Sequence, residues 1–365
     1  LTFERTEGNA GAPTRPQDPE GPLPYHVEDV AFDNDDGGHR LAGTFTRPEG
    51  DGPHPAVILI SGSGPQDRNE ALVGHRPFLV LSDHLTRAGI AVLRFDDRGV
   101  GESTGDFATA TSFDFASDVL AAVRYLTGRP DVDRDHIGLA GHSEGGLIAP
   151  IVATQTSDVA YIVLMAGPGV NGERILQAQS ALISRATGLS EERIEVNAGY
   201  ATRMYAVLKS DLSSDDAMTA LREIAEEQMA GASAEELAAS GITDENRDQV
   251  LQAQLGALNS PWFRSFLTYE PGETLEKVSV PVLAINGEKD LQVPYEENLR
   301  EIEEALLRGG NTHYQIHAFP GLNHLFQQAE TGHPQEYGSI EETWAPEAME
   351  LIAGWIKEVV SRPAS

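Results

Sequence analysis

The chain has 365 residues, of which 57 are Asp or Glu and 26 are Lys or Arg, so its formal net charge is −31 at pH 7. A hydrophobic share of 40% supports a sizeable core and excludes a wholly disordered chain. The negative charge argues against nucleic acid and anionic membranes as partners. Because Cys is absent, disulfides, thiolate metal sites and Cys nucleophiles are excluded. Such acidity is typical of a solvated acidic face or of a protein from a salty habitat, and both origins stay open.

Residues 1–26 contain much Pro, Gly and charge without a hydrophobic period, which predicts a tail or linker. The chain begins with Leu1 rather than Met, so we also expect a processed or truncated N-terminus. Beyond it, Val30–Phe32 and Leu41–Phe45 alternate apolar and polar residues. The turn-rich stretch Asn34–Gly38 separates them, so the pattern predicts an antiparallel hairpin.

Short, continuous apolar runs then alternate with longer stretches at helical spacing. The apolar runs are Ala56–Ile60, Ala91–Phe95, Ile137–Ala140, Tyr161–Met165, Val282–Ile285 and Tyr314–Phe319. The helix-like stretches are Pro77–Ala88, Phe113–Leu126, Glu144–Thr154, Tyr295–Leu307 and Trp344–Val360. Apolar runs of this length are typical of parallel strands buried on both faces. The alternation therefore predicts a mostly parallel sheet with right-handed crossovers.

One segment interrupts this rhythm. Residues 169–276 have no strand pattern but contain much Ala, Glu, Leu and Met at helical spacing. Because the segment follows one strand and precedes another, we interpret it as a helical cap inserted into an α/β core. The core is then formed by residues 27–168 and 277–365. No run of about 18 apolar residues occurs, so we expect no membrane span.

The G-x-S-x-G pattern of a serine nucleophile occurs twice, at 101–105 and at 141–145. The chemistry needs the Ser on a tight strand-to-helix turn, where its hydroxyl is exposed and the next N–H points at the oxyanion. Ser143 follows an apolar run and opens a helix-compatible one, whereas Ser103 follows a loop and opens no helix at once. We therefore predict Ser143 as the nucleophile and Ser103 as a turn residue whose hydroxyl binds the backbone.

A serine hydroxyl needs a base to take its proton and an acid to orient that base. After such an elbow, the acid and then the His follow in chain order. The loop that follows Val282–Ile285 contains Glu288 and Asp290, and we favour Asp290 as the acid. His324 follows the last strand and is the predicted base. The other His residues are interpreted as surface or structural, with no metal site among them.

The oxyanion needs a second N–H donor, from the loop at 61–69 that follows the first parallel strand. We predict the backbone N–H groups of Ser63 and Glu144 as the two donors. A Gly-rich loop could also bind phosphate, but this one lacks the Gly-Lys-Ser/Thr of a P-loop. The polar residues at 66–68 either brace the loop or are simple surface residues.

These motifs make the chain resemble the serine α/β-hydrolase superfamily over residues 27–361. The turn at 95–103 is similar to the D-x-R-G-x-G-x-S turn common in that superfamily. Four further runs resemble a group of bacterial carboxylesterases, also described as S9/S33-peptidase-like hydrolases. They are SGSGPQDRN at 61–69, GHSEGG at 141–146, NGEKDLQVP at 286–294 and GLNHLFQ at 321–327. The sequence departs from the wider superfamily at Ser61-Gly62, where many members have His-Gly.

The resemblance implies an α/β-hydrolase fold, with a mostly parallel eight-stranded sheet flanked by helices and a helical cap insertion. It implies no cofactor. Some members of the carboxylesterase group look exported and carry an extra N-terminal β-rich domain. Leu1–Arg5 is compatible with the last strand of such a domain, and together with the absence of Cys this slightly favours a periplasmic or extracellular protein.

The residue at the elbow separates the chemistries of this fold. Epoxide hydrolases and haloalkane dehalogenases use Asp there and dienelactone hydrolases use Cys, so a Ser leaves acyl transfer to water. We predict a carboxylesterase for small to medium acyl esters. The alternatives are a peptidase or amidase of the proline-iminopeptidase kind, a thioesterase, an acyltransferase and an inactive binding module. The peptidase would need cap acids to bind a substrate amine, but Glu191, Glu192 and Glu195 look like solvated helix faces.

Overall fold

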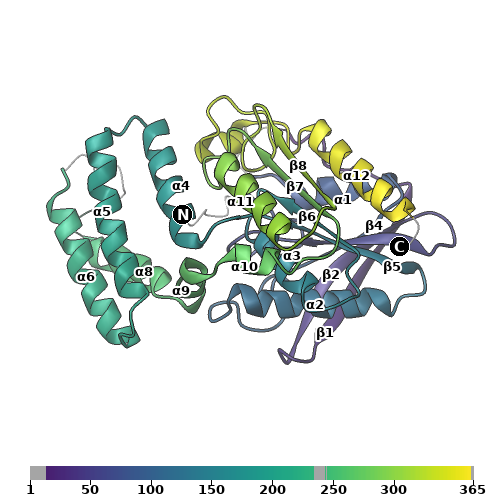
Figure 1. Ribbon diagram of the computed structural model, residues 1–365, viewed down its shortest axis with the longest axis horizontal. Helices are drawn as coiled ribbons and strands as arrows, with labels where there is room; N and C mark the ends of the chain where they lie inside the picture. The colour runs from purple at the N-terminus through teal and green to yellow at the C-terminus, as the bar shows by residue number, and fades with distance from the viewer. Residues whose placement is uncertain (1–13, 234–242, 244, 363–365) are drawn as a thin grey trace. The chain divides into compact units, whose positions relative to one another are not determined.

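The computed structural model describes residues 14–233, 243 and 245–362, and these fall into two compact units (Figure 1). Unit 1 contains the described residues up to Phe107, Ser112–Val170 and those from Glu270 onward. Unit 2 contains Ala108–Thr111 and Asn171–Tyr269. Unit 2 resembles the expected insertion at 169–276 but includes a short segment from before it, and the division as predicted stays a prediction. Leu1–Arg5, compared above with a domain's last strand, lies outside the described residues.

Unit 1 is built on one eight-stranded sheet in the order β1-β2-β4-β3-β5-β6-β7-β8. Its strands are β1 (Tyr25–Asn34), β2 (His39–Pro48), β3 (His54–Ile60), β4 (Ala91–Phe95), β5 (Val132–His142), β6 (Tyr161–Met165), β7 (Val282–Gly287) and β8 (Tyr314–Phe319). β1 pairs antiparallel with β2, and β2 antiparallel with β4, whereas all later neighbours are parallel. The predicted edge hairpin and mostly parallel sheet of an α/β-hydrolase fold are therefore confirmed.

Helices cover both faces of this sheet. α1 (Pro77–Arg87) and α12 (Pro346–Ser361) contact each other and share one apolar cluster with the strands, where Phe78, Leu81 and Ile352 are buried. α2 (Ser112–Thr127) and α3 (Glu144–Ala153) pack together over β3 and β5 on the other face (Figure 1). The remaining helices of unit 1 are α10 (Pro271–Leu275), α11 (Tyr295–Arg308) and the short 3₁₀ helix η1 (Pro334–Ser339). All five predicted helices of this unit are present.

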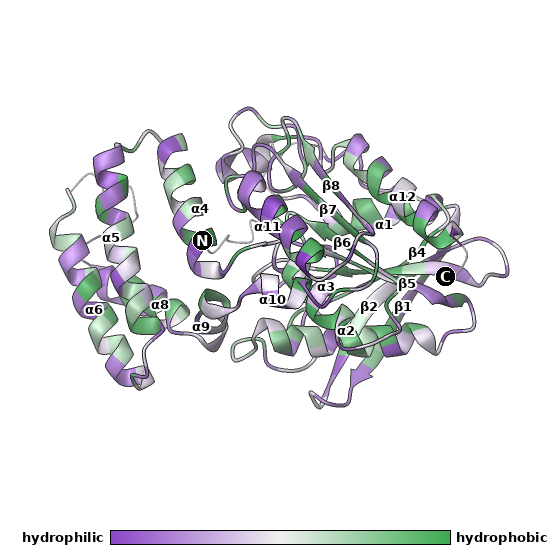
Figure 2. Cartoon of the chain, viewed as in Figure 1, coloured by the Kyte–Doolittle hydropathy of each residue, from purple (hydrophilic) through white to green (hydrophobic). Residues whose placement is uncertain are grey.

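The described part of unit 2 is helical, as its composition predicts. It contains α4 (Gly172–Ala186), α5 (Glu191–Leu208), α6 (Ser214–Ala230), α8 (Arg247–Leu258) and α9 (Pro261–Thr268). Asn171, Ser190 and Ser213 start α4, α5 and α6 by accepting a bond from a first-turn N–H, the usual role of an N-cap. The helices show apolar and polar faces (Figure 2), and the apolar faces form a separate small core with buried Leu221 and Leu255.

Residues 14–24 belong to the predicted N-terminal tail, yet they are fastened to unit 1. Arg15 donates to the backbone carbonyls of Gly338 and Ile340, over 2.9 and 2.6 Å. Gln17 accepts the backbone N–H groups of Thr343 and Trp344. Two long polar side chains thus hold a segment that has no hydrophobic period. Hydrophobic periodicity in the sequence does not predict hydrogen bonds of this kind.

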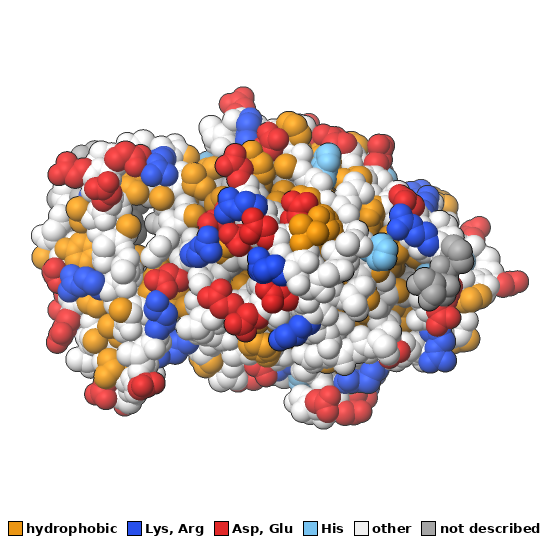
Figure 3. Space-filling view, in the orientation of Figure 1, with side chains coloured by type: hydrophobic (Ala, Val, Ile, Leu, Met, Phe, Trp, Pro, Cys, Tyr) orange, Lys and Arg blue, Asp and Glu red, His pale blue; other side chains and the backbone are white. Residues whose placement is uncertain are grey.

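Acidic side chains are spread over the visible face of the molecule, many of them beside a basic one (Figure 3). Exposed pairs of this kind include Arg308 with Glu276 and Arg185 with Glu191, each at 2.7 Å. Such pairs contribute little stability individually and are screened by salt. Among the described helices, none is long and apolar enough to cross a bilayer.

Candidate active site

Ser143 lies at the turn between β5 and α3. Its backbone has φ 51° and ψ −116°, which is an uncommon conformation for a residue other than Gly. A Cβ at Gly141 would lie 2.0 Å from the carbonyl oxygen of Gly145, and a Cβ at Gly145 would lie 2.2 Å from that of Ile60. The flanking glycines therefore permit the close strand–helix approach that the sequence predicts, and Ser143 stays partly accessible.

The predicted acid and base come together in the loops that follow β7 and β8. Asp290 Oδ2 and His324 Nδ1 are 2.7 Å apart, and both side chains are buried. The other carboxylate oxygen, Oδ1, accepts the backbone N–H groups of Gln292 and Val293 over 2.7 and 2.9 Å. Hydrogen bonds to both carboxylate oxygens thus fix the orientation of Asp290. Glu288, the competing carboxylate, is exposed.

Ser143 and His324 are linked through a third residue. The ring of His142, next to Ser143, lies 4.8 Å from the His324 ring, and His142 Nε2 is 3.0 Å from the His324 carbonyl oxygen. Among the residues described, no hydrogen bond joins the Ser143 hydroxyl to His324 itself. Catalytic hydrogen bonds of free enzymes are often long and tighten only with substrate present. The triad assignment stays a prediction.

The two predicted oxyanion donors lie in the loop after β3 and at the start of α3. The N–H of Gly62 donates to Glu70 Oε1 over 2.7 Å, so it is already engaged. The N–H of Ser63 has no acceptor among the described residues. Glu144 is the first residue of α3, where the helix dipole favours negative charge. Ser63 and Glu144 stay the predicted donors.

The polar residues at 66–68 contribute to hydrogen bonds that brace the oxyanion loop and are not simple surface residues. The N–H of Gln66 and the hydroxyl of Ser61 both donate to Asp97, each over 2.9 Å. Arg68 donates to Asp96 Oδ2 over 2.7 Å. Burial raises the pKa of the Asp97 carboxyl well above its usual range. The loop is therefore tied to the strand end that carries Asp96 and Asp97.

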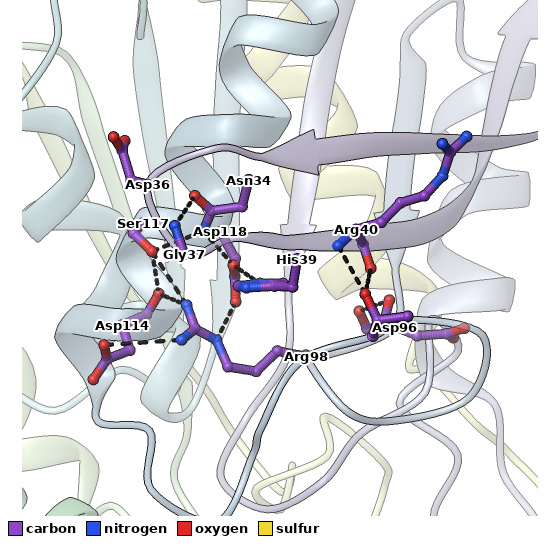
Figure 4. A network of polar contacts seen from close by, with 12 residues as sticks. Asn34, Asp36, Gly37, His39, Arg40, Asp96, Arg98, Asp114, Ser117 and Asp118 are labelled. Atoms are coloured by element: carbon purple, nitrogen blue, oxygen red, sulfur yellow. Dashed lines mark hydrogen bonds and ion pairs between the residues drawn. The ribbon is translucent and has the colours of Figure 1, made fainter.

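Ser103 has the environment predicted for a turn residue. Its hydroxyl donates to the Asp96 carbonyl over 2.7 Å and accepts the N–H of Ala42 over 2.9 Å. The turn is held in place nearby by a polar network around Asp118 (Figure 4). There Arg98 Nε, His39 Nε2 and Asn34 Nδ2 each lie 2.7 Å from an Asp118 oxygen. The hydroxyl of Ser103 is therefore buried and fully bonded, and its structural role is confirmed.

Two other His residues make local contacts within their own segments. His317 packs edge-on against Phe319, and His333 caps η1. Among the residues described, no group of His, Asp and Glu side chains could hold a metal ion. Sequence reasoning overlooked Glu70, which bonds both Gly62 and His142. Glu70 directly follows the run at 61–69, in the loop between β3 and α1, and carries no pattern of its own.

Comparisons with known proteins agree on the fold. Esterase EstD of Thermotoga maritima is 26% identical over 320 residues, which are 86% of this chain but only 65% of EstD. An esterase of Pyrococcus furiosus has a TM-score of 0.55 at 16% identity, covering 98% of this chain and 97% of that one. The alpha/beta hydrolase GrgF from Penicillium also has a TM-score of 0.55, at 19% identity, covering 92% of this chain and all of GrgF.

These solved structures show a similar fold at low identity, and EstD adds a likeness at the level of sequence. A family model described as the alpha/beta hydrolase family matches residues 57–337, a range that includes Ser143, Asp290 and His324. The match thus spans most of the sheet described above. The chain belongs to the alpha/beta hydrolase family.

Proposed function

We propose that this protein is a serine carboxylesterase for small to medium acyl esters. The observation that carries the proposal is the buried Asp290–His324 pair at 2.7 Å, linked through His142 to a serine on a strained strand-to-helix turn. A buried His that is oriented by a carboxylate and lies near a serine elbow is the arrangement that activates a serine hydroxyl. The likeness to EstD supports an ester as the substrate.

In the proposed reaction, Ser143 Oγ attacks the acyl carbon while His324 Nε2 takes its proton. Asp290 holds Nδ1–H of His324, so that Nε2 is the basic nitrogen, and it stabilises the imidazolium that forms. The N–H groups of Ser63 and Glu144 receive the oxyanion. His324 then gives the proton to the departing alcohol. A water molecule, deprotonated by His324 in turn, releases the acid and restores Ser143.

No observation favours the peptidase alternative. That activity needs a carboxylate that is available to bind the substrate amine, and two of the described acids of unit 2 already have cationic partners. Glu191 pairs with Arg185 at 2.7 Å, and Glu227 pairs with Arg203 at 2.7 Å, both on exposed surface. Glu191 and Glu192 lie in the first turn of α5, where the helix dipole stabilises negative charge.

We propose a soluble ester rather than an emulsified lipid as the substrate. The large exposed apolar side chains in the described part of the chain lie on four different helices or strands and in one loop: Val27, Phe113, Val196, Leu307 and, in the loop between α5 and α6, Leu212. Enzymes that dock on oil droplets need a contiguous apolar face. We therefore expect faster turnover of a butyrate ester in solution than of an emulsified long-chain triglyceride.

A substrate panel tests this proposal. Nitrophenyl acetate, butyrate, octanoate and palmitate are compared with an acyl thioester and with aminoacyl nitroanilides. We expect turnover of the short nitrophenyl esters and none of the anilides. Ser143→Ala should abolish turnover, while Ser103→Ala, the matched substitution in the other motif, should keep most of it. Anilide turnover that exceeds ester turnover would establish the peptidase instead.

A further inference from the structure

His142 occupies a place that the proposed reaction does not explain. It is almost fully buried between the elbow, the oxyanion loop and the loop that carries His324. His142 Nδ1 lies 2.9 Å from Glu70 Oε1, and Nε2 lies 3.0 Å from the carbonyl oxygen of His324. One ring therefore contacts two segments that are far apart in the sequence, directly beside Ser143.

The partners of His142 decide its protonation. A carbonyl oxygen can only accept, so Nε2 must carry a hydrogen toward His324. Glu70 Oε1 also accepts the N–H of Gly62 over 2.7 Å, which favours its ionised, acceptor-only form. Nδ1 must then carry a hydrogen as well. A ring that donates from both nitrogens is an imidazolium, which makes Glu70 and His142 a buried ion pair.

The surrounding charges agree with this geometry. Burial alone lowers the pKa of His142, but the charge and hydrogen bond of Glu70, the His324 carbonyl and the charge of Asp290 outweigh it and raise the pKa above its usual range. The titratable side chains that face His142 are thus Glu70, Asp290 and, ring to ring, His324. The negative charges of Glu70 and Asp290 can therefore balance two positive charges, that of His142 and the one that forms when His324 takes a proton.

Glu70 is held in an unusual backbone conformation. Its φ is 51°, in the left-handed region that residues other than Gly rarely adopt, and its side chain is buried. Such a conformation persists only where the surroundings fix it, and it occurs frequently at functional sites. Here the fixed carboxylate engages the N–H of Gly62, which directly precedes the predicted oxyanion donor Ser63.

We propose that His142, held as an imidazolium by Glu70, is a positioning residue that joins the oxyanion loop to the His324 loop. The proposal rests on the proposed function for its effect on the reaction. When His142 loses its proton, the carboxylate of Glu70, as the stronger acceptor, keeps Nδ1–H, and the lone pair of Nε2 then faces the carbonyl oxygen of His324. The contact between His142 and the His324 loop is lost, so His324 is held less well for proton transfer from Ser143. Activity should therefore fall on the alkaline side, as the pH rises through the pKa of His142.

Two substitutions of Glu70 separate charge from position. In Glu70→Gln, the amide oxygen takes the place of Oε1, so it can still accept from the N–H of Gly62 and from Nδ1–H of a neutral His142, and both contacts survive without the charge. For Glu70→Gln we expect a loss of kcat of less than about tenfold. Its pH profile should also lack the fall in activity at alkaline pH that comes from deprotonation of His142 in the wild type. Glu70→Ala removes both contacts, and kcat should fall by about 10²-fold with a smaller change in KM, as for loss of one oxyanion donor. Glu288→Gln, at an exposed site, is the matched control.

Side-chain ¹⁵N NMR of histidine-labelled protein tests the protonation without any substrate, with the His142 signal assigned by its loss in His142→Gln. We expect two protonated ring nitrogens at neutral pH in the wild type and one in Glu70→Gln. A neutral His142 in the wild type at pH 7, or Glu70→Ala activity equal to that of Glu288→Gln, would overturn the proposal. If the wild type neither hydrolyses esters nor reacts with a fluorophosphonate, the proposed function fails, and with it the role in the reaction, while the NMR result still decides the ion pair.

Discussion

The two G-x-S-x-G stretches of this chain share a pattern and differ in everything around it. Ser143 follows a buried strand, starts a helix and leaves its hydroxyl without a hydrogen-bond partner in the described structure. Ser103 lies in a turn, where its hydroxyl is bonded on both sides, to Asp96 and Ala42. A free hydroxyl is available for chemistry, whereas a bonded one is part of the fold. The pattern therefore identifies a nucleophile only together with the element on each side.

The sharpest way to break this comparison is to remove each hydroxyl in turn. Ser143→Ala should lower kcat for a short nitrophenyl ester by about 10⁴–10⁶-fold, because the attacking group is gone. Ser103→Ala should retain most activity, since its hydroxyl contacts only backbone groups. The measurement is steady-state turnover, supported by mass spectrometry of fluorophosphonate-labelled peptides. A label on Ser103 would reverse the assignment.

The next effect concerns the two carboxylates of the acid loop. Asp290→Asn should lower kcat by about 10⁴-fold, because an amide neither fixes the useful tautomer of His324 nor stabilises its charged form. Glu288→Gln should change kcat little, because Glu288 is exposed while Asp290 lies 2.7 Å from His324. Parallel kinetics of both variants decide the matter, and a greater loss at Glu288 would contradict the assignment.

Much of this arrangement follows from local sequence. Continuous apolar runs such as Tyr161–Met165 are unambiguous when both faces of a strand are buried, and the structure has β6 over those same residues. Asp290 and His324 follow their strands directly, so the position of each strand also places the residue. The glycines at 141 and 145 are predictable for the same reason, because a strand and a helix must approach there.

The contacts that the sequence did not predict join segments far apart in the chain. Glu70 and His142 are 72 residues apart, and Glu70 lies in an irregular loop whose polar residues have no period. Arg15 and Gln17 anchor their segment through side-chain bonds to residues more than 300 positions away. Likewise, nothing in the composition of Ala108–Thr111 indicates that this segment belongs with unit 2. Hydrophobic periodicity predicts which residues of one helix or strand are buried, but it does not predict contacts between segments that are far apart in the sequence.

A glycine of the elbow gives a smaller effect. In Gly145→Ala the new Cβ meets the Ile60 carbonyl at 2.2 Å, and neither backbone can move without displacing β3 or Ser143. We expect about 10²-fold loss of kcat, as for a misplacement of about 1 Å, and about 1–3 kcal/mol of destabilisation. Gly354→Ala is the control, since a Cβ there meets nothing within 4 Å. Full activity of Gly145→Ala would show that the elbow tolerates a wider strand–helix gap.

The smallest effect distinguishes the two serines by stability alone. Ser103 is 7% exposed, so Ser103→Ala leaves the Ala42 N–H and the Asp96 carbonyl without their partner inside the fold. Leaving buried polar groups unpaired costs about 1–3 kcal/mol. Urea titrations of Ser103→Ala should therefore give a free energy of unfolding that is lower by about 1–3 kcal/mol. The kcat of this variant should change by no more than about twofold. Ser143→Ala should show the reverse, because its hydroxyl has no such bonds to lose among the described residues. If instead both variants unfold at the same urea concentration as the wild type, the bonds of Ser103 add nothing to stability, and the difference between the two motifs lies in geometry alone.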